Sequence, residues 1–347
     1  MESFAGKFED EQLRPIFING RQIGAGAQPY LIAEIGINHG GDVGKAKELI
    51  VAASKAGADS VKLQCYRSEE FLAPSSEYFH ILKDAELSEE AIIDLVGFAN
   101  QHGITLFASV FDEPSAEFMA SLDTPAFKVA SGDLTHLPLL MKIAEYGKPI
   151  VLSSGGATLG DIETAIECIR QVNHEIDIAL LHCVSSYPTK AEDTNLACLS
   201  GMRKQFSVPI GFSDHTLGET SAVAAVALGA ELIEKHFTLD RNDDGPDHAL
   251  SSDPNGLAVL AEAMQSAWKS IGSSSKKPVE ESRFVKQIRR SLNARVSIPA
   301  GSIITSEMLA IRRPGTGIDP IDVTLVLGRK SKHDIEAGFP IVWGMLE

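Results

Sequence analysis

The sequence places two histidines at the ends of neighbouring apolar runs, where they could share a metal ion. His215 follows the run 208–213, and His236 lies near the end of the run 231–237. A single histidine at such a place is usually a hydrogen-bonded structural residue, but two on adjacent strands could bind one divalent ion through their imidazole nitrogens. Such a site would leave positions open for water and a substrate oxygen, which suits Mn²⁺, Zn²⁺, Fe²⁺ or Co²⁺ better than Ca²⁺. A purely structural pair is the alternative.

Two lysines, Lys62 and Lys128, lie inside other apolar runs. A buried ammonium group is unfavourable unless it is paired with a carboxylate or reaches solvent. One interpretation pairs the lysines with structural carboxylates such as Glu34 and Glu234. The other interpretation is that they bind an anionic ligand.

Serine hydroxyls follow the ends of several of the same runs, and the segment SSGG at 153–156 adds backbone N–H groups in a glycine-rich turn before a helical pattern. Such turns are natural phosphate-binding concavities. Each serine alone is a weak signal, but together with the two lysines they suit a small anion that carries both a phosphate and a carboxylate. The serines are Ser109, Ser131, Ser153, Ser185 and Ser213.

The elements that must position these residues are eight short apolar runs alternating with stretches of helical period, which is the pattern of βα units. This number of units predicts a (β/α)₈ TIM barrel, in which the polar residues at the strand ends, Asp214 and Lys235 among them, converge on one mouth. A doubly wound open sheet is the main alternative, but EIGINHGGD after the first run lacks the GxGxxG spacing. The runs are 30–37, 60–66, 104–110, 126–131, 149–154, 178–184, 208–213 and 231–237.

The composition and the hydrophobic pattern of the sequence change near its end. A segment rich in serine and charge gives way to short β-prone pieces separated by turns, which predicts a small, mostly β second domain. We expect a catalytic barrel over 1–272, a linker over 273–290 and the small domain over 291–347.

Composition narrows the possible partners and location. The formal net charge of −16 argues against a broad surface for nucleic acid or anionic membrane. The first twenty residues lack the apolar core of a signal peptide, and no apolar stretch is long enough to span a membrane, so we expect a cytoplasmic protein. The four cysteines show no CxxC spacing and are expected to be free, mostly buried thiols.

Ordered motifs from about residue 30 to the end resemble the bacterial sialic acid synthases, the N-acetylneuraminate synthases and their legionaminate and pseudaminate relatives. The tail resembles the antifreeze-like (SAF) domain of that family. The motifs are IAEIGINHGGD, GADSVKLQ, FKVASGD, PIVLSSGGAT, LLHCVSSYPT, GFSDHTLG, ALGAELIEKHFTLD, GPDH and RPGTGI.

The resemblance implies condensation of phosphoenolpyruvate with an open-chain N-acylated mannosamine-type sugar, giving a nine-carbon 2-keto acid and phosphate. It implies a divalent metal, Mn²⁺ first and Mg²⁺ or Co²⁺ as alternatives, held by His215 and His236. Lys62 and Lys128, with Ser109 beside them, match contacts to the phosphoenolpyruvate carboxylate, and the residues that match its phosphate cradle are Ser131, Ser153, Ser185 and Ser213. Two positions depart from the family pattern, because many members have threonine at Ser109 and some have asparagine at Ser185.

Further positions match residues that face the sugar: Glu34, Gln64, Tyr187 and Asp247. Glu34 is also the candidate for orienting or deprotonating the water that completes the reaction. Arg313 matches an arginine that the small domain sends into the barrel of the partner subunit, which implies a homodimer with exchanged C-terminal domains.

The sugar itself stays open. N-acetylmannosamine and a 2,4-diacetamido-2,4,6-trideoxyhexose, the substrate type of legionaminate or pseudaminate synthases, are both compatible with the motifs. Two other functions are alternatives: a phosphoenolpyruvate aldolase that acts on a sugar phosphate, and a non-catalytic barrel that binds carbohydrate.

Overall fold

The structure, a computed structural model, describes residues 14–273 and 283–347. The chain divides into two compact units, Met1–Ser274 and Ser275–Glu347. Residues 274–282 of the predicted linker lie outside the described part, so the predicted domain boundaries stay a prediction. In the described part, no helix is long and apolar enough to cross a membrane.

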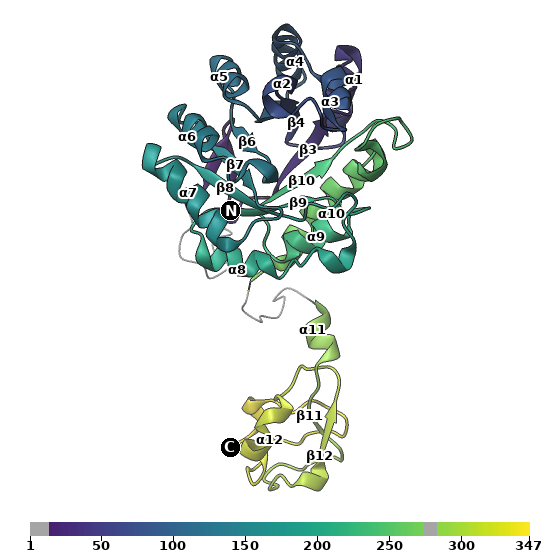
Figure 1. The fold of residues 1–347 in the computed structure, drawn as a ribbon. Helices are drawn as coiled ribbons and strands as arrows, with labels where there is room; N and C mark the ends of the chain where they lie inside the picture. Colours follow the sequence, from purple (N-terminus) through teal and green to yellow (C-terminus); the bar gives the residue numbers. More distant parts are fainter. Residues whose placement is uncertain (1–13, 274–282) are drawn as a thin grey trace. The chain divides into compact units, whose positions relative to one another are not determined.

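The first unit contains a closed barrel of eight parallel strands, in the order β10-β3-β4-β5-β6-β7-β8-β9. This confirms the (β/α)₈ prediction, and helices surround the strands (Figure 1). The strands are β3 (Tyr30–Gly36), β4 (Ser60–Cys65), β5 (Thr105–Val110), β6 (Phe127–Val129), β7 (Ile150–Ser153), β8 (Ile178–Cys183), β9 (Ile210–Asp214) and β10 (Leu232–His236).

Several helices of this unit begin where the sequence supplies a capping side chain. Asp42, Ser88 and Asp253 each accept a hydrogen bond from a backbone N–H of the first turn that follows. The helices are α1 (Val43–Lys55), α4 (Glu89–Gln101), α5 (Glu113–Ser121), α6 (Leu137–Glu145), α7 (Leu159–Val172), α8 (Cys198–Gln205), α9 (Thr220–Ala227) and α10 (Pro254–Ile271), with the shorter α2 (Ser68–Phe71) and α3 (Phe79–Ala85) between β4 and α4.

Alternation of side chains along each strand separates two cores. Outward side chains such as Leu63, Val110 and Leu152 pack against the helices. Inward side chains such as Ile32, Phe107 and Val151 form an apolar interior cluster together with three isoleucines of the hairpin β1 (Ile16–Ile18) and β2 (Arg21–Ile23). The interior changes from apolar to polar toward the carboxyl ends of the strands, which is where the predicted site residues lie.

The second unit has a separate apolar core, built from residues such as Leu292, Ile298, Ile318 and Ile341. Its strands β11 (Ser291–Ala294) and β12 (Leu309–Arg312) pair antiparallel, and it contains a short helix, α12 (Val323–Val326). The helix α11 (Arg283–Ile288) lies within the range 273–290 that was predicted as the linker. The carbonyl of Lys286 accepts a hydrogen bond from the Gly315 amide at 2.7 Å, which ties this segment to the small unit.

Candidate active site at the carboxyl ends of the barrel strands

Lys62 lies at the centre of a buried polar cluster inside the barrel. Its Nζ is 2.5 Å from Glu34 Oε2 and 3.7 Å from Glu234 Oε2, and it donates a hydrogen bond to Ser109 Oγ at 2.7 Å. Strand register accounts for the contact, because Glu34 and Lys62 are direct partners on β3 and β4. The side chains of Lys62, Glu34 and Glu234 are at least nine-tenths buried.

Lys128 forms the second half of this cluster. Its Nζ donates to Ser153 Oγ at 2.7 Å and to the Val129 carbonyl at 3.0 Å, and it lies 3.9 Å from Glu234 Oε1. Glu234 in turn accepts a hydrogen bond from Ser213 Oγ at 2.8 Å. The pairing of both lysines with carboxylates, one of the two interpretations of the sequence, is therefore present. The same contacts bring the ammonium groups of the lysines and the hydroxyl groups of the serines together inside the barrel mouth.

The pKa values of the two carboxyl groups of the cluster, Glu34 and Glu234, are shifted in opposite directions. Burial raises the pKa of Glu34 to about 7, against the pull of the Lys62 ammonium. Burial also acts to raise the pKa of Glu234, but the ammonium groups of Lys128 and Lys62 outweigh it and lower this pKa to about 2. Carboxyl pairs whose environments separate their pKa values divide acid–base roles between them. Glu234 is thus the permanent counterion, and Glu34 can hold or release a proton near neutral pH.

Three polar side chains converge on Gly155, in the turn that follows β7. The Gly155 amide donates to Ser131 Oγ at 2.9 Å, in the 3₁₀ turn η1 (Ser131–Asp133). A Cβ atom at Gly155 would collide with Ser185 Oγ and lie 2.8 Å from Ser131 Oγ and 3.2 Å from Cys183 Sγ. The lack of a side chain at Gly155 lets these groups approach the turn closely, and hydroxyl and backbone N–H groups gathered in this way suit an anion.

The helix that follows this turn begins with a capping box. Thr158 Oγ1 accepts from the Asp161 amide and the Asp161 carboxylate accepts from the Thr158 amide, which satisfies two N–H groups at the start of α7. The polar groups that the structure places at Gly155 itself are the hydroxyl groups of Ser131 and Ser185.

The two histidines lie side by side at the ends of β9 and β10, with ring centroids 5.3 Å apart. His215 Nδ1 is 2.9 Å from the Val184 carbonyl, and since a carbonyl only accepts, Nδ1 carries the proton and Nε2 has a lone pair when the ring is neutral. Burial acts to lower the pKa of His215, but the adjacent Cys183 thiol outweighs it and raises this pKa, so a metal ion at Nε2 would compete with a proton. His236 Nδ1 is buried and has no hydrogen-bond partner in the described residues. Burial, and next the neighbouring His215, lower the pKa of His236 well below its usual value, which keeps it in the neutral, ligating form.

These two imidazoles fit a divalent metal ion. One has its tautomer fixed by a backbone carbonyl, and the other presents a buried nitrogen that a metal would satisfy. Asp247 Oδ2 lies 3.6 Å from His236 Nδ1 and adds a carboxylate to the same region. Two protein ligands would leave coordination positions for oxygen atoms of substrate or water.

The other predicted sugar-facing residues of the barrel surround the histidines and Glu34. Gln64 Nε2 donates to Glu34 Oε1 at 3.4 Å. The ring of Tyr187, which is 55% exposed, lies 4.2 Å from the His215 ring and 6.1 Å from the His236 ring. The structure thus brings the barrel residues of the predicted site together. Arg313 follows β12 in the other unit, and its predicted role stays a prediction.

Two residues of the site were not predicted from sequence. Gly155 was seen only as part of a glycine-rich turn, and Cys183 only as a buried thiol. Cys183 is the inward residue that follows Ala179 and Leu181 along β8, so a period of two could have placed it inside the barrel. All four cysteines are free, and three of them are buried, as expected.

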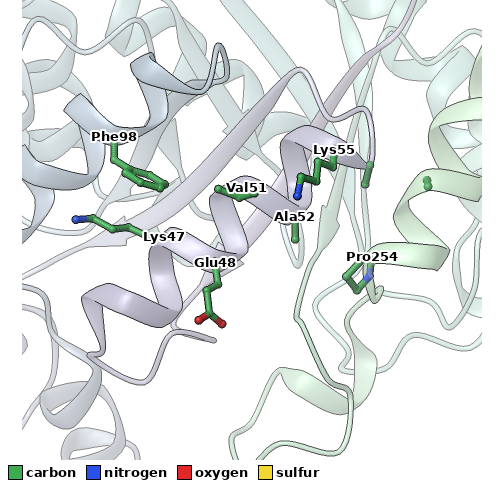
Figure 2. A pocket seen from close by; sticks show the side chains of 9 residues that line it. Lys47, Glu48, Val51, Ala52, Lys55, Phe98 and Pro254 are labelled. Carbon is green, nitrogen blue, oxygen red and sulfur yellow. The ribbon is translucent and has the colours of Figure 1, made fainter.

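A separate apolar cleft of about 490 Å³ lies on the outer helix layer, between α1, α4 and α10. Figure 2 shows Lys47 and Phe98 at one side of it and Pro254 at the other. None of the predicted site residues lines this cleft, and Lys47 is paired there with Asp94 at 2.6 Å.

The fold and the site define a (β/α)₈-barrel enzyme whose polar residues gather at the carboxyl ends of the strands, the place where such barrels carry out catalysis. The NeuB family model matches residues 49–276, and the SAF domain model matches residues 289–347. The chain belongs to the NeuB family, the sialic, legionaminic and pseudaminic acid synthases, with a C-terminal SAF domain. Members are phosphoenolpyruvate-dependent nonulosonic acid synthases, transferases of the EC 2.5.1 type.

Individual relatives cover nearly the whole chain. The protein MJ1065 of Methanocaldococcus jannaschii is 42% identical over 95% of this chain and 98% of its own length. The N,N'-diacetyllegionaminic acid synthase of Legionella pneumophila is 36% identical, with coverages of 95% and 98%. The crystal structure of an N-acetylneuraminic acid synthetase from Leptospira borgpetersenii, in complex with citrate, has a TM-score of 0.75 and 34% identity, and the alignment covers 78% of this chain and 95% of that one.

Proposed function

We propose that the protein condenses phosphoenolpyruvate with open-chain N-acetylmannosamine, or a close analogue, to form N-acetylneuraminate or the corresponding nonulosonic acid. The observation that carries this proposal is the juxtaposition of two features inside one barrel mouth. Lys62 and Lys128, with their serine partners, lie beside the hydroxyl-lined concavity at Gly155, and the pair His215 and His236 lies on the neighbouring strands.

In this proposal the anion site holds phosphoenolpyruvate. The ammonium groups of Lys62 and Lys128 bind its carboxylate together with Ser109. The phosphate is bound by four serine hydroxyl groups: those of Ser131 and Ser185 at Gly155, that of Ser153 on Lys128, and that of Ser213 on Glu234. Ser213 donates to Glu234 in the structure, so its hydroxyl must rotate to donate to the phosphate. Charge-assisted hydrogen bonds of this kind are the strong ones.

The sugar aldehyde then lies toward His215 and His236, with Gln64, Tyr187 and Asp247 around it. A divalent ion held by the two imidazoles, Mn²⁺ first and Mg²⁺ or Co²⁺ as alternatives, supplies Lewis acidity at the aldehyde oxygen when bound. The protein's contribution is to hold the aldehyde carbon close to C3 of phosphoenolpyruvate, which converts a bimolecular reaction into an intramolecular one.

Bond formation from C3 to the aldehyde carbon breaks the C=C and C=O π bonds. It turns the aldehyde oxygen into an alkoxide, which takes up a proton to become a hydroxyl group, and it leaves positive charge at C2. The carboxylates of Glu34 and Glu234 stabilise this charge electrostatically because they lie in a buried, low-dielectric site. Glu34 orients or deprotonates the water that adds to C2, which its pKa of about 7 permits. The resulting tetrahedral carbon expels phosphate with its bridging oxygen, so the C–O bond breaks and the P–O bond does not.

The identity of the sugar is tested by phosphate release. Purified protein is mixed with Mn²⁺, phosphoenolpyruvate and one of three sugars: N-acetylmannosamine, its 6-phosphate, or a 2,4-diacetamido-2,4,6-trideoxyhexose. Identity to relatives does not choose among the three sugars, because a legionaminic acid synthase, an N-acetylneuraminate-9-phosphate synthase of Mus musculus and an N-acetylneuraminic acid synthetase are 36%, 35% and 34% identical. Phosphate release with the 6-phosphate alone would show that the substrate is a sugar phosphate and the product a nonulosonic acid phosphate, as the name of the 9-phosphate synthases states for those relatives. Release with none of the sugars would favour a carbohydrate-binding barrel.

The proposal includes a cytoplasmic homodimer in which each small domain serves the partner's barrel through Arg313. Arginine would hold a polar substrate by its forked set of donors. The match of the SAF model to residues 289–347 supports the presence of the domain that would make this exchange.

A further inference from the structure

Asp214 and Lys235 immediately precede the two histidines on neighbouring strands of the barrel. Lys235 and Asp214 are direct partners in the register of β10 and β9. The preceding residues, Ser213 and Glu234, bond to each other inside the barrel. Because side chains alternate along a strand, Asp214 and Lys235 lie on the opposite, helix-facing side, and not at the mouth as the sequence suggested.

The Lys235 ammonium contacts the chain on both sides of His215. Its Nζ donates to Asp214 Oδ2 at 2.8 Å and to the Thr216 carbonyl at 2.5 Å. Asp214 Oδ1 accepts from the Thr216 amide at 2.8 Å, which closes the loop around His215. Since Lys235 is bonded through its own backbone to His236, one ammonium group connects the two chain segments that carry the histidines.

The pair is fully buried, with side chains 1% and 0% exposed. Outward-facing positions near the same ends of other strands are apolar, among them Cys65, Val110 and Leu152. A buried ion pair contributes little net stability compared with an apolar pair of similar volume, because desolvation offsets the attraction between the charges. What it does add is a fixed geometry, because each hydrogen bond has a preferred length and direction.

We propose that the Lys235–Asp214 pair is a positioning device for the metal site, and that it sets the separation and orientation of His215 and His236. This inference rests on the proposed binding of a divalent ion by the two histidines. Both imidazole nitrogens must lie about 2.0–2.2 Å from one ion, so a small relative shift of β9 and β10 would move one of them out of range. Groups outside a metal's ligand shell typically contribute 10- to 100-fold to its affinity.

The test removes both charges together. The double variant Asp214→Asn/Lys235→Met leaves no uncompensated buried charge, and the asparagine keeps an acceptor for the Thr216 amide. The matched control, Lys47→Met/Asp94→Asn, removes an ion pair of the same composition from α1 and α4. Three quantities are measured on the metal-stripped, full-length proteins: the Mn²⁺ dissociation constant from the electron paramagnetic resonance of free Mn²⁺, the thermal unfolding midpoint, and the affinity for phosphoenolpyruvate without metal.

We expect the double variant to bind Mn²⁺ about 10- to 100-fold more weakly than the wild type, whereas the control binds it as the wild type does. Phosphoenolpyruvate affinity and the unfolding midpoint of the double variant stay close to those of the control. A Mn²⁺ dissociation constant within twofold of the wild type overturns the positioning role, and so does a parallel loss of phosphoenolpyruvate affinity, because that indicates general disruption of the barrel.

Two further variants distinguish failure of the positioning role from failure of the proposed metal site. If the double variant does not fold, Lys235→Arg keeps the charge pair but displaces its donors, and it is expected to weaken Mn²⁺ binding in the same measurement; unchanged binding would count against the proposal. His236→Ala tests the metal site itself. If it binds Mn²⁺ as tightly as the wild type, the assignment of the metal to the histidines fails, and the positioning role fails with it. If it loses Mn²⁺ and the Lys235–Asp214 variants do not, only the positioning role fails.

Discussion

Glu34 and Lys62 are direct partners on the first two strands of the barrel, and their charged atoms lie 2.5 Å apart inside it. The same ammonium group lies 3.7 Å from Glu234, which holds the lower pKa of the two carboxyl groups. One carboxyl group therefore stays ionised beside both lysines, while the other can exchange a proton close to the proposed substrate site. This division of roles underlies the first prediction.

Glu34→Gln should abolish turnover while leaving substrate binding intact. General acid–base groups typically contribute about 10²- to 10⁴-fold to rate, and kcat should fall by that factor. The affinity for phosphoenolpyruvate should stay the same or increase, because one negative charge beside Lys62 is removed. Steady-state kinetics together with equilibrium binding measure both quantities. A kcat within tenfold of the wild type would show that Glu34 does not handle a proton in the limiting step.

Gly155→Ala should weaken phosphoenolpyruvate binding selectively. The added methyl group would occupy the space toward which Ser131 and Ser185 point, and overpacking of this kind costs typically about 1–3 kcal/mol, or roughly 5- to 150-fold in affinity. Mn²⁺ affinity should not change. Gly160→Ala, on α7 with Thr158 Oγ1 at 3.8 Å from the added carbon, is the matched control. Equal phosphoenolpyruvate affinities in the two variants would show that the anion does not bind at this turn.

His39 should make stability depend on pH between about 6.5 and 4. Burial lowers its pKa to about 4, and its Nδ1 accepts a hydrogen bond from the Gly41 amide, so the folded protein favours neutral His39. The unfolded chain binds this proton at higher pH than the folded one. The contribution to stability is therefore fully present above pH 6.5 and is lost as the pH falls toward 4, by up to about 3 kcal/mol.

Urea unfolding at several pH values measures this effect, and His39→Gln should reduce the slope of unfolding free energy against pH within that window. Identical slopes for the variant and the wild type would mean that other groups account for the acid sensitivity.

Complementation tests whether the active site spans two subunits. Glu34→Gln and Arg313→Ala should each be nearly inactive as homodimers. After co-refolding in equal amounts, about half of the dimers are mixed, and each of these has one intact site if Arg313 acts on the partner's barrel. About a quarter of wild-type activity is expected. Verified mixed dimers with no activity above that of the separate variants would place Arg313 on its own barrel or outside the site.

The architecture could be predicted from sequence because it depends on local patterns. Eight apolar runs with helical stretches between them require only periodicity to be recognised, and the strand ends of a barrel necessarily share one mouth. The details that depend on register could not be predicted. The sequence places Asp214 and Lys235 among the mouth residues, whereas the pairing of β9 with β10 shows that they form a salt bridge on the helix-facing side.

The candidate site, too, could be predicted only in part. The residue types at the strand ends indicated an anion site and a metal pair, and the structure brings them together. The convergence of Ser131, Ser185 and Cys183 on Gly155 depends on contacts between residues far apart in sequence. So does the separation of the Glu34 and Glu234 pKa values, which arises from burial and from distances to two lysines.

The most direct test of the proposed function is the reaction in ¹⁸O-labelled water with Mn²⁺, phosphoenolpyruvate and N-acetylmannosamine or its 2,4-diacetamido analogue, with both products analysed by mass spectrometry. Carbon–carbon bond formation followed by water addition at C2 predicts a nine-carbon 2-keto acid together with phosphate that carries no label. Labelled phosphate, or phosphate release without a nine-carbon acid, would show that the protein hydrolyses phosphoenolpyruvate at phosphorus and would contradict the proposed condensation.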